Sequence, residues 1–99
     1  MKKAEELAGD DEIARNEGLL TAEVDGELMA MSIERGTCYS LNAVGTRVWE
    51  LLAEPRTFDD LCALLLREYE VEPAQCRSEL LSLLEDMRAE GLAVVRSRG

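Results

Sequence analysis

The sequence contains no histidine, and its 99 residues include only one Trp, one Phe and two Pro. Without an imidazole, the chain cannot use His as a general base, as the activator of a Ser or Cys nucleophile, or as a metal ligand. The three cysteines, Cys38, Cys62 and Cys76, form no CxxC pair that could begin a zinc or redox site. We therefore expect a protein that is not an enzyme, with no catalytic residue, no metal and no cofactor.

Long apolar runs are also missing. The N-terminal stretch MKKAEELAGDDEIARNEG places acids where a signal peptide needs an unbroken apolar segment, and no apolar run reaches 18 residues. We expect a cytoplasmic protein with no membrane partner. The odd number of cysteines, each among apolar residues, predicts small, reduced side chains in the core.

Positive charge is scarce as well. The chain has 11 Lys and Arg against 21 Asp and Glu, which gives a formal net charge of -10. Residues 1–34 alone hold three basic and ten acidic side chains. Such a surface repels phosphate backbones, so we expect no nucleic-acid partner.

The chain does contain enough apolar residues to form one hydrophobic core. Its hydrophobic fraction is 46%, which is sufficient for a single domain of this length. The polar start and the later patterning predict a flexible acidic segment over residues 1–18 and a folded domain over residues 19–95.

The pattern of residues 19–41 predicts a three-stranded antiparallel meander at the start of the domain. LLTAEV, ELMAMSIE and TCYSL are separated by Asp25-Gly26, a preferred type I′ hairpin pair, and by Arg35-Gly36. In the middle strand alternate residues share a face. One face holds Leu28, Ala30 and Ser32, and the other holds Met29, Met31 and Ile33.

From residue 42 the apolar period becomes helical. Asn42 is the expected N-cap of AVGTRVWELLAE, which Pro55 ends; Thr57 caps a second helix, and Pro73 opens a third that stops at Gly91. LAVV is a candidate terminal strand. The predicted buried positions of the first two helices are Val44, Val48, Leu51, Leu52, Phe58, Leu61, Cys62, Leu65 and Tyr69. The predicted fold class is α+β, winged-helix-like, with a three-stranded meander followed by three helices.

These residues resemble the PqqD family over roughly residues 19–95. The similarity lies in DGELMAMSIERGTCYSLNAVGTRVWELL, in PRTFDDLCALLLREYEVEPAQC, and in a leucine-rich helix that ends EGLAVV. Its most specific parts are the junction Tyr39-Ser40-Leu41-Asn42, with Gly45 and Trp49, and the connection from Tyr69 to Pro73.

The resemblance implies a peptide-recognition element of ribosomal natural-product biosynthesis. Such a domain holds the leader of a precursor peptide and presents it to modifying enzymes, namely a leader protease, a cyclase or a radical enzyme. Stand-alone proteins of this size are similar to the leader-binding proteins of lasso-peptide pathways and to the PqqD chaperone of quinone-cofactor synthesis. In them the leader adds as a strand beside the third strand and packs against the third helix. Here that strand is Thr37, Cys38, Tyr39, Ser40 and Leu41.

The residues themselves support an open edge at the third strand, because TCYSL carries no charge and no proline to guard it. An alternative is that LAVV or a second copy covers this edge. On the third helix, successive residues lie about 100° apart. This spacing predicts a core stripe of Cys76, Leu80, Leu83 and Met87, and a mixed apolar and basic flank of Arg77, Leu81, Leu84 and Arg88. The resemblance implies that this flank binds the peptide. An alternative is that Leu81 contacts the first or second helix and that both arginines are ordinary solvated residues.

Other functions remain open at this stage. Strands and three helices also describe a winged-helix DNA-binding regulator, although neither of the last two helices has net positive charge. An acidic protein-protein adaptor is a further alternative. We expect a monomer or a weak homodimer.

Overall fold

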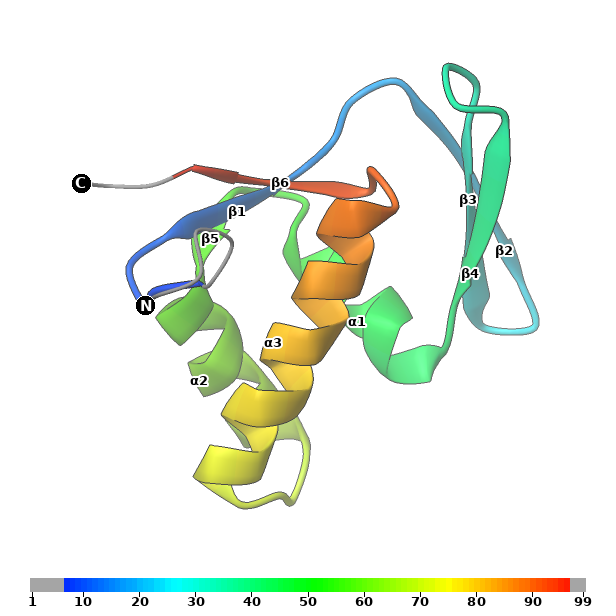
Figure 1. Ribbon diagram of the computed structural model, residues 1–99. Helices are drawn as coiled ribbons and strands as arrows, with labels where there is room; N and C mark the ends of the chain where they lie inside the picture. Colours follow the sequence, from blue (N-terminus) through cyan, green and yellow to red (C-terminus); the bar gives the residue numbers. More distant parts are fainter. Residues whose placement is uncertain (1–6, 97–99) are drawn as a thin grey trace.

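A computed structural model describes residues 7–96 of the chain. Its first sheet is the predicted antiparallel meander of β2 (Leu19–Val24), β3 (Glu27–Ser32) and β4 (Thr37–Leu41), in the order β2-β3-β4 (Figure 1). Asp25 and Gly26 both have positive φ, as a type I′ turn requires. The second connection is longer than predicted: residues 33–36 join β3 to β4, and Gly36 has a φ of +66°.

Three helices follow, as predicted: α1 (Ala43–Leu51), α2 (Phe58–Glu68) and α3 (Pro73–Ala89). The Asn42 Oδ1 atom accepts the Gly45 N–H at 2.9 Å, and the Thr57 hydroxyl accepts the Asp60 N–H at 3.1 Å, so both N-caps are confirmed. Pro73 lies in the first turn of α3. The α+β class and the meander followed by three helices are therefore confirmed.

A second sheet, which the sequence analysis did not predict as a whole, joins the two ends of the chain. It consists of β1 (Glu12–Arg15), β5 (Arg56–Thr57) and β6 (Ala93–Arg96), in the order β5-β1-β6. The LAVV strand is thus present, as β6. The segment predicted to be flexible, residues 1–18, contains β1 with Ile13 fully buried, so that prediction is wrong at residues 12–15. Residues 1–6 of that segment lie outside the described residues.

The missed strand has a simple physical explanation. β1 has four residues, EIAR, and only Ile13 and Ala14 are apolar, which is too short a pattern to stand out in an acidic stretch. Its stability comes from partners far along the chain, since Ile13 pairs with Val95 on one side and with Arg56 on the other.

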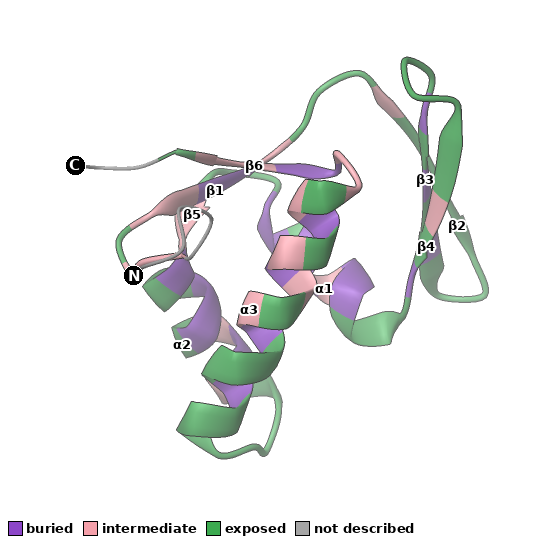
Figure 2. Cartoon of the chain, viewed as in Figure 1, coloured by how far each residue is buried: buried purple, intermediate pink, exposed green. Residues whose placement is uncertain are grey.

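One core unites both sheets and the helices. Ile13, Leu61, Met87 and Leu92 contribute to it from β1, α2, α3 and the segment before β6. The meander contributes through one face only, because Leu28, Ala30 and Ser32 are buried whereas Met29 and Met31 are exposed, which confirms the predicted alternation (Figure 2).

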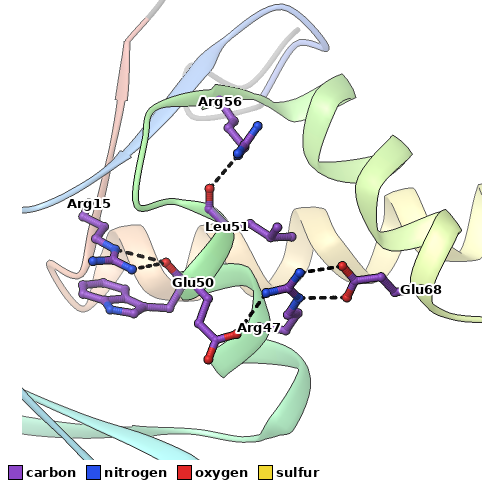
Figure 3. A network of polar contacts seen from close by, with 7 residues as sticks. Arg15, Arg47, Glu50, Leu51, Arg56 and Glu68 are labelled. Atoms are coloured by element: carbon purple, nitrogen blue, oxygen red, sulfur yellow. Dashed lines mark hydrogen bonds and ion pairs between the residues drawn. The ribbon is translucent and has the colours of Figure 1, made fainter.

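Arginines satisfy the carbonyls at the end of α1 (Figure 3). Arg15 donates through Nε and Nη2 to the Trp49 oxygen at 3.0 and 2.7 Å, and its guanidinium lies 4.6 Å from the centre of the Trp49 ring. Arg56 Nε donates to the Leu51 oxygen at 2.6 Å. Cations at the C-terminal end of a helix complement its dipole, so β1 and β5 are fixed to α1 by charge-assisted contacts.

The cysteines divide into two kinds. Cys62 and Cys76 are buried, as predicted, whereas Cys38 is exposed on β4, so the expectation of a core position is wrong there. Burial raises the pKa of the Cys62 thiol and that of the Cys76 thiol.

Ile13→Ala tests the place of β1 in the core. We expect it to lower the free energy of unfolding by about 2–4 kcal/mol, because the missing side chain leaves a cavity. Leu20→Ala is the control at a side chain that is 57% exposed, and it should change stability by less than about 0.5 kcal/mol. Urea denaturation measures both variants. Equal losses, or no loss from Ile13→Ala, would contradict the position of β1.

A second prediction concerns thiol reactivity. In native buffer at neutral pH, Cys38 should react with a thiol reagent such as DTNB well before Cys62 and Cys76, because only the thiolate reacts and burial disfavours it. Mass spectrometry of partially labelled protein identifies the modified residue. Equal labelling of all three cysteines in the native protein would contradict the buried positions of Cys62 and Cys76.

Candidate functional site

The free edge of β4 is the first element of the site. Within residues 7–96, β4 has one strand neighbour, β3, and the C-terminal strand β6 pairs with β1 instead. The alternative that LAVV covers this edge is therefore excluded. The strand is TCYSL, which has no charged residue and no proline, so an extended segment could hydrogen-bond along it.

A hollow of about 280 Å³ begins where β4 ends. Its walls come from the start of α1, the end of α2, the α2–α3 connection and α3 as far as Leu83. The lining residues are Asn42, Val44, Leu65, Tyr69, Val71, Cys76, Glu79, Leu80 and Leu83. The lining is mainly apolar, with Glu79 as its one ionised side chain, so it suits apolar side chains of a ligand.

Two hydrogen-bonded contacts hold β4 in place beside the helices. The buried Thr46 hydroxyl of α1 accepts the Leu28 N–H at 2.9 Å and donates to the Leu41 oxygen at 3.2 Å. At the other end, Arg35 of the β3–β4 turn donates through Nη1 to the Ala89 oxygen at 3.1 Å. These contacts hold the meander to α1 at one end and to the last turn of α3 at the other, which preorganises the site.

The predicted helix flank lies elsewhere. Arg77 Nη1 contacts Asp59 Oδ1 at 2.8 Å, and the guanidinium lies 5.0 Å from the centre of the Phe58 ring. Asp59 and Phe58 belong to the first turn of α2, which runs along the side of α3 away from the meander (Figure 1). The Asp59 carboxylate also raises the pKa of Arg77 through this hydrogen bond.

The other three residues of that flank follow the same side. Leu84 is only 1% exposed and belongs to the core, so its prediction as a surface residue is wrong. Leu81 is half-buried and packs against the core, and Arg88 is half-buried in the last turn of α3. The structure thus brings Thr37 to Leu41 together on one edge but does not bring Arg77 and Leu84 to it.

The prediction for Leu83 is wrong in the opposite direction to that for Leu84. Leu83 was predicted as core, yet it is half-buried and lines the hollow with Glu79. Val44 and Tyr69, also predicted as buried, are exposed there. The core centre of α3 lies closer to Leu84 than to Leu83, because α2 packs on the Arg77 side. In the sequence, the adjacent leucines Leu83 and Leu84 were the only sign that either of them could be the buried one.

Two further surveys concern the part of the chain that the structure describes. No helix in residues 7–96 is long and apolar enough to cross a membrane. No group of three or more Cys, Asp or Glu side chains within those residues is arranged to hold a metal ion.

Two solved structures share this fold. TbiB1 in complex with the TbiA(beta) leader peptide matches with a TM-score of 0.74 and 25% identity, over 81% of this chain and 93% of that one. Lasso peptide synthetase B1 complexed with the leader peptide matches with a TM-score of 0.73, over 83% and 96% of the two chains. At 20% identity, the second similarity shows the fold alone.

Sequence comparisons give one match. No curated protein is similar enough in sequence to count as a match. The family model for coenzyme PQQ synthesis protein D (PqqD) matches residues 27–93, from β3 to the start of β6. Since these residues are more than half of the sequence and include β4 and all three helices, the chain belongs to the PqqD family.

Proposed function

We propose that the protein binds the leader region of a ribosomally made precursor peptide and presents it to modifying enzymes, such as a leader protease and a cyclase. The observation that carries this proposal is the open β4 edge next to an apolar hollow. Family membership and the leader complexes of two proteins with the same fold support it. The protein acts by binding, without catalysis.

In this proposal the leader becomes a fourth strand beside β4. Its backbone pairs with Thr37 to Leu41, and every second side chain turns toward α3, because side chains alternate along a strand. Those side chains enter the hollow against Leu80 and Leu83. The exposed side chains of Val44, Tyr69 and Val71 lose contact with water when the leader covers them, which favours binding.

The charge of the hollow limits what the leader can carry there. Glu79 lies in its wall, and Asp86 and Glu90 follow on the same shoulder of α3 at the helical spacing. A leader residue beside this shoulder should be apolar or basic rather than acidic. Free cysteines fit a reducing compartment, and we propose the cytoplasm as the location.

A leader titration tests the function directly. A synthetic leader from the precursor encoded beside the gene should bind with a Kd in the micromolar range or below, on the order of -8 kcal/mol. Calorimetry and amide spectra measure this binding, and duplex DNA is the control, which a net charge of -10 should exclude at physiological salt. No heat and no spectral change with the leader, or a DNA complex that ignores the leader, would contradict the proposal.

A pair of leucine variants distinguishes the two sides of α3. Leu83→Glu should weaken leader binding by at least about tenfold, because it places a carboxylate among the apolar side chains of the hollow. Leu81→Glu, the matched change on the side facing α2, should bind within about twofold of the parent when folded. Fluorescence anisotropy measures binding, and thermal melts confirm folding, with Leu80→Glu as the unfolded reference at a buried position. If Leu81→Glu is folded and binds the leader more weakly while Leu83→Glu binds like the parent, the site lies on the α2 side of the helix.

Backbone methylation of the leader tests strand addition. An N-methyl group removes one N–H donor, and in a strand only alternate N–H groups face the neighbouring strand. Methylation at alternate leader positions should therefore reduce affinity strongly in one register and little in the other. Anisotropy with the two methylated peptides measures this. Equal affinities for both would contradict pairing with β4 and indicate binding through side chains only.

A further inference from the structure

The large apolar side chains exposed within residues 7–96 fall into two groups. Three line the hollow beside α3: Val44, Tyr69 and Val71. The other five lie on β2, β3 and the turn that follows, and they are between 38% and 66% exposed: Leu20, Val24, Met29, Met31 and Ile33. Leader binding in the hollow accounts for the first group and leaves the second unexplained.

Four of these five side chains belong to the outer face of the meander. Strand pairing aligns Leu20 with Met31, and Met31 with Cys38; one step along, Ala22 aligns with Met29, and Met29 with Ser40. On the inner face, Leu28 and Ala30 of β3 and Leu41 of β4 are buried in the core. A shallow depression of about 190 Å³ lies among these side chains on β2, β3 and β4. The outer face therefore presents apolar side chains from β2 and β3, next to Cys38 of β4.

Acidic side chains lie on this outer face and next to it. Strand pairing places Glu27 opposite Val24 on the outer face, Asp25 lies in the turn between β2 and β3, and residues 16–34 contain no Lys or Arg. A second copy of the chain would bring a similar acidic border against this one, at a net charge of -10 per copy. A partner with an apolar patch bordered by Lys and Arg fits better, because it removes the apolar area from water and pairs the acids.

We propose that the outer face of β2, β3 and β4 docks the enzyme that modifies the bound precursor, through an apolar patch bordered by basic residues. This inference rests on the proposed function. A leader strand beside β4 continues the same sheet, so its outward side chains lie next to Cys38 and Ser40 on the outer face. The enzyme then contacts the domain and the leader together, which couples recognition of the leader to delivery of the precursor.

The test uses variants of exposed residues that do not line the hollow. The double variant Leu20→Gln/Met31→Gln removes apolar surface, and Glu27→Lys reverses the charge of an exposed acid on the same face. Ala53→Gln/Ala63→Gln is the matched control at exposed positions elsewhere. Each precursor-modifying enzyme encoded beside the gene is purified and titrated against the four proteins by biolayer interferometry. Leader affinity and sedimentation velocity are measured in parallel.

We expect one of these enzymes to bind the parent and the control equally, and to bind both outer-face variants more weakly, by on the order of tenfold or more. Its affinity for the parent should fall as salt increases. Leader affinity should stay within about twofold for all four proteins. Equal enzyme binding by all variants, no binding of any such enzyme to the parent, or a parent dimer lost in Leu20→Gln/Met31→Gln would overturn the docking proposal. Loss of leader binding by the parent itself would instead overturn the proposed function.

Discussion

The buried hydroxyl of Thr46 is the contact on which the arrangement of the site depends. It accepts a hydrogen bond from β3 and donates one to the end of β4, so a single side chain of α1 positions both strands. Its polar groups are thus satisfied away from water, and the geometry that satisfies them is specific. Because β4 is held at this point, its end lies next to the apolar hollow that begins at Asn42.

The second sheet joins the two ends of the described chain by strand pairing. β1 lies between β5 and β6, so the start of the described chain is paired with its end, and Ile13 fills the core between them. Arg15 and Arg56 extend this sheet to the end of α1 by donating to backbone carbonyls. With the strands of the chain ends paired to each other, none of them competes for β4. The edge that we propose for recognition is open because the terminal strand β6 pairs with β1.

The meander presents two surfaces for two different tasks. Its edge offers backbone groups, which suit an extended peptide, and its outer face offers exposed apolar side chains with an acidic border, which suit a folded partner. On the inner face, β3 and the end of β4 pack on the core and support both surfaces. Since an added strand would enlarge the outer face, the two proposed tasks are physically linked within one small domain.

The sequence by itself determined the local features of this protein. The Asp25-Gly26 turn, the caps at Asn42 and Thr57, and the alternation in β3 all follow from contacts between neighbours in the chain, which is why the meander, the helices and the β4 edge were predictable. The tertiary structure alone decided which of Leu83 and Leu84 faces the core. These residues are adjacent and about 100° apart on one helix, so either could be buried, and the packing of α2 made the choice. β1 was decided in the same way, because its stability comes from strands more than 40 residues away.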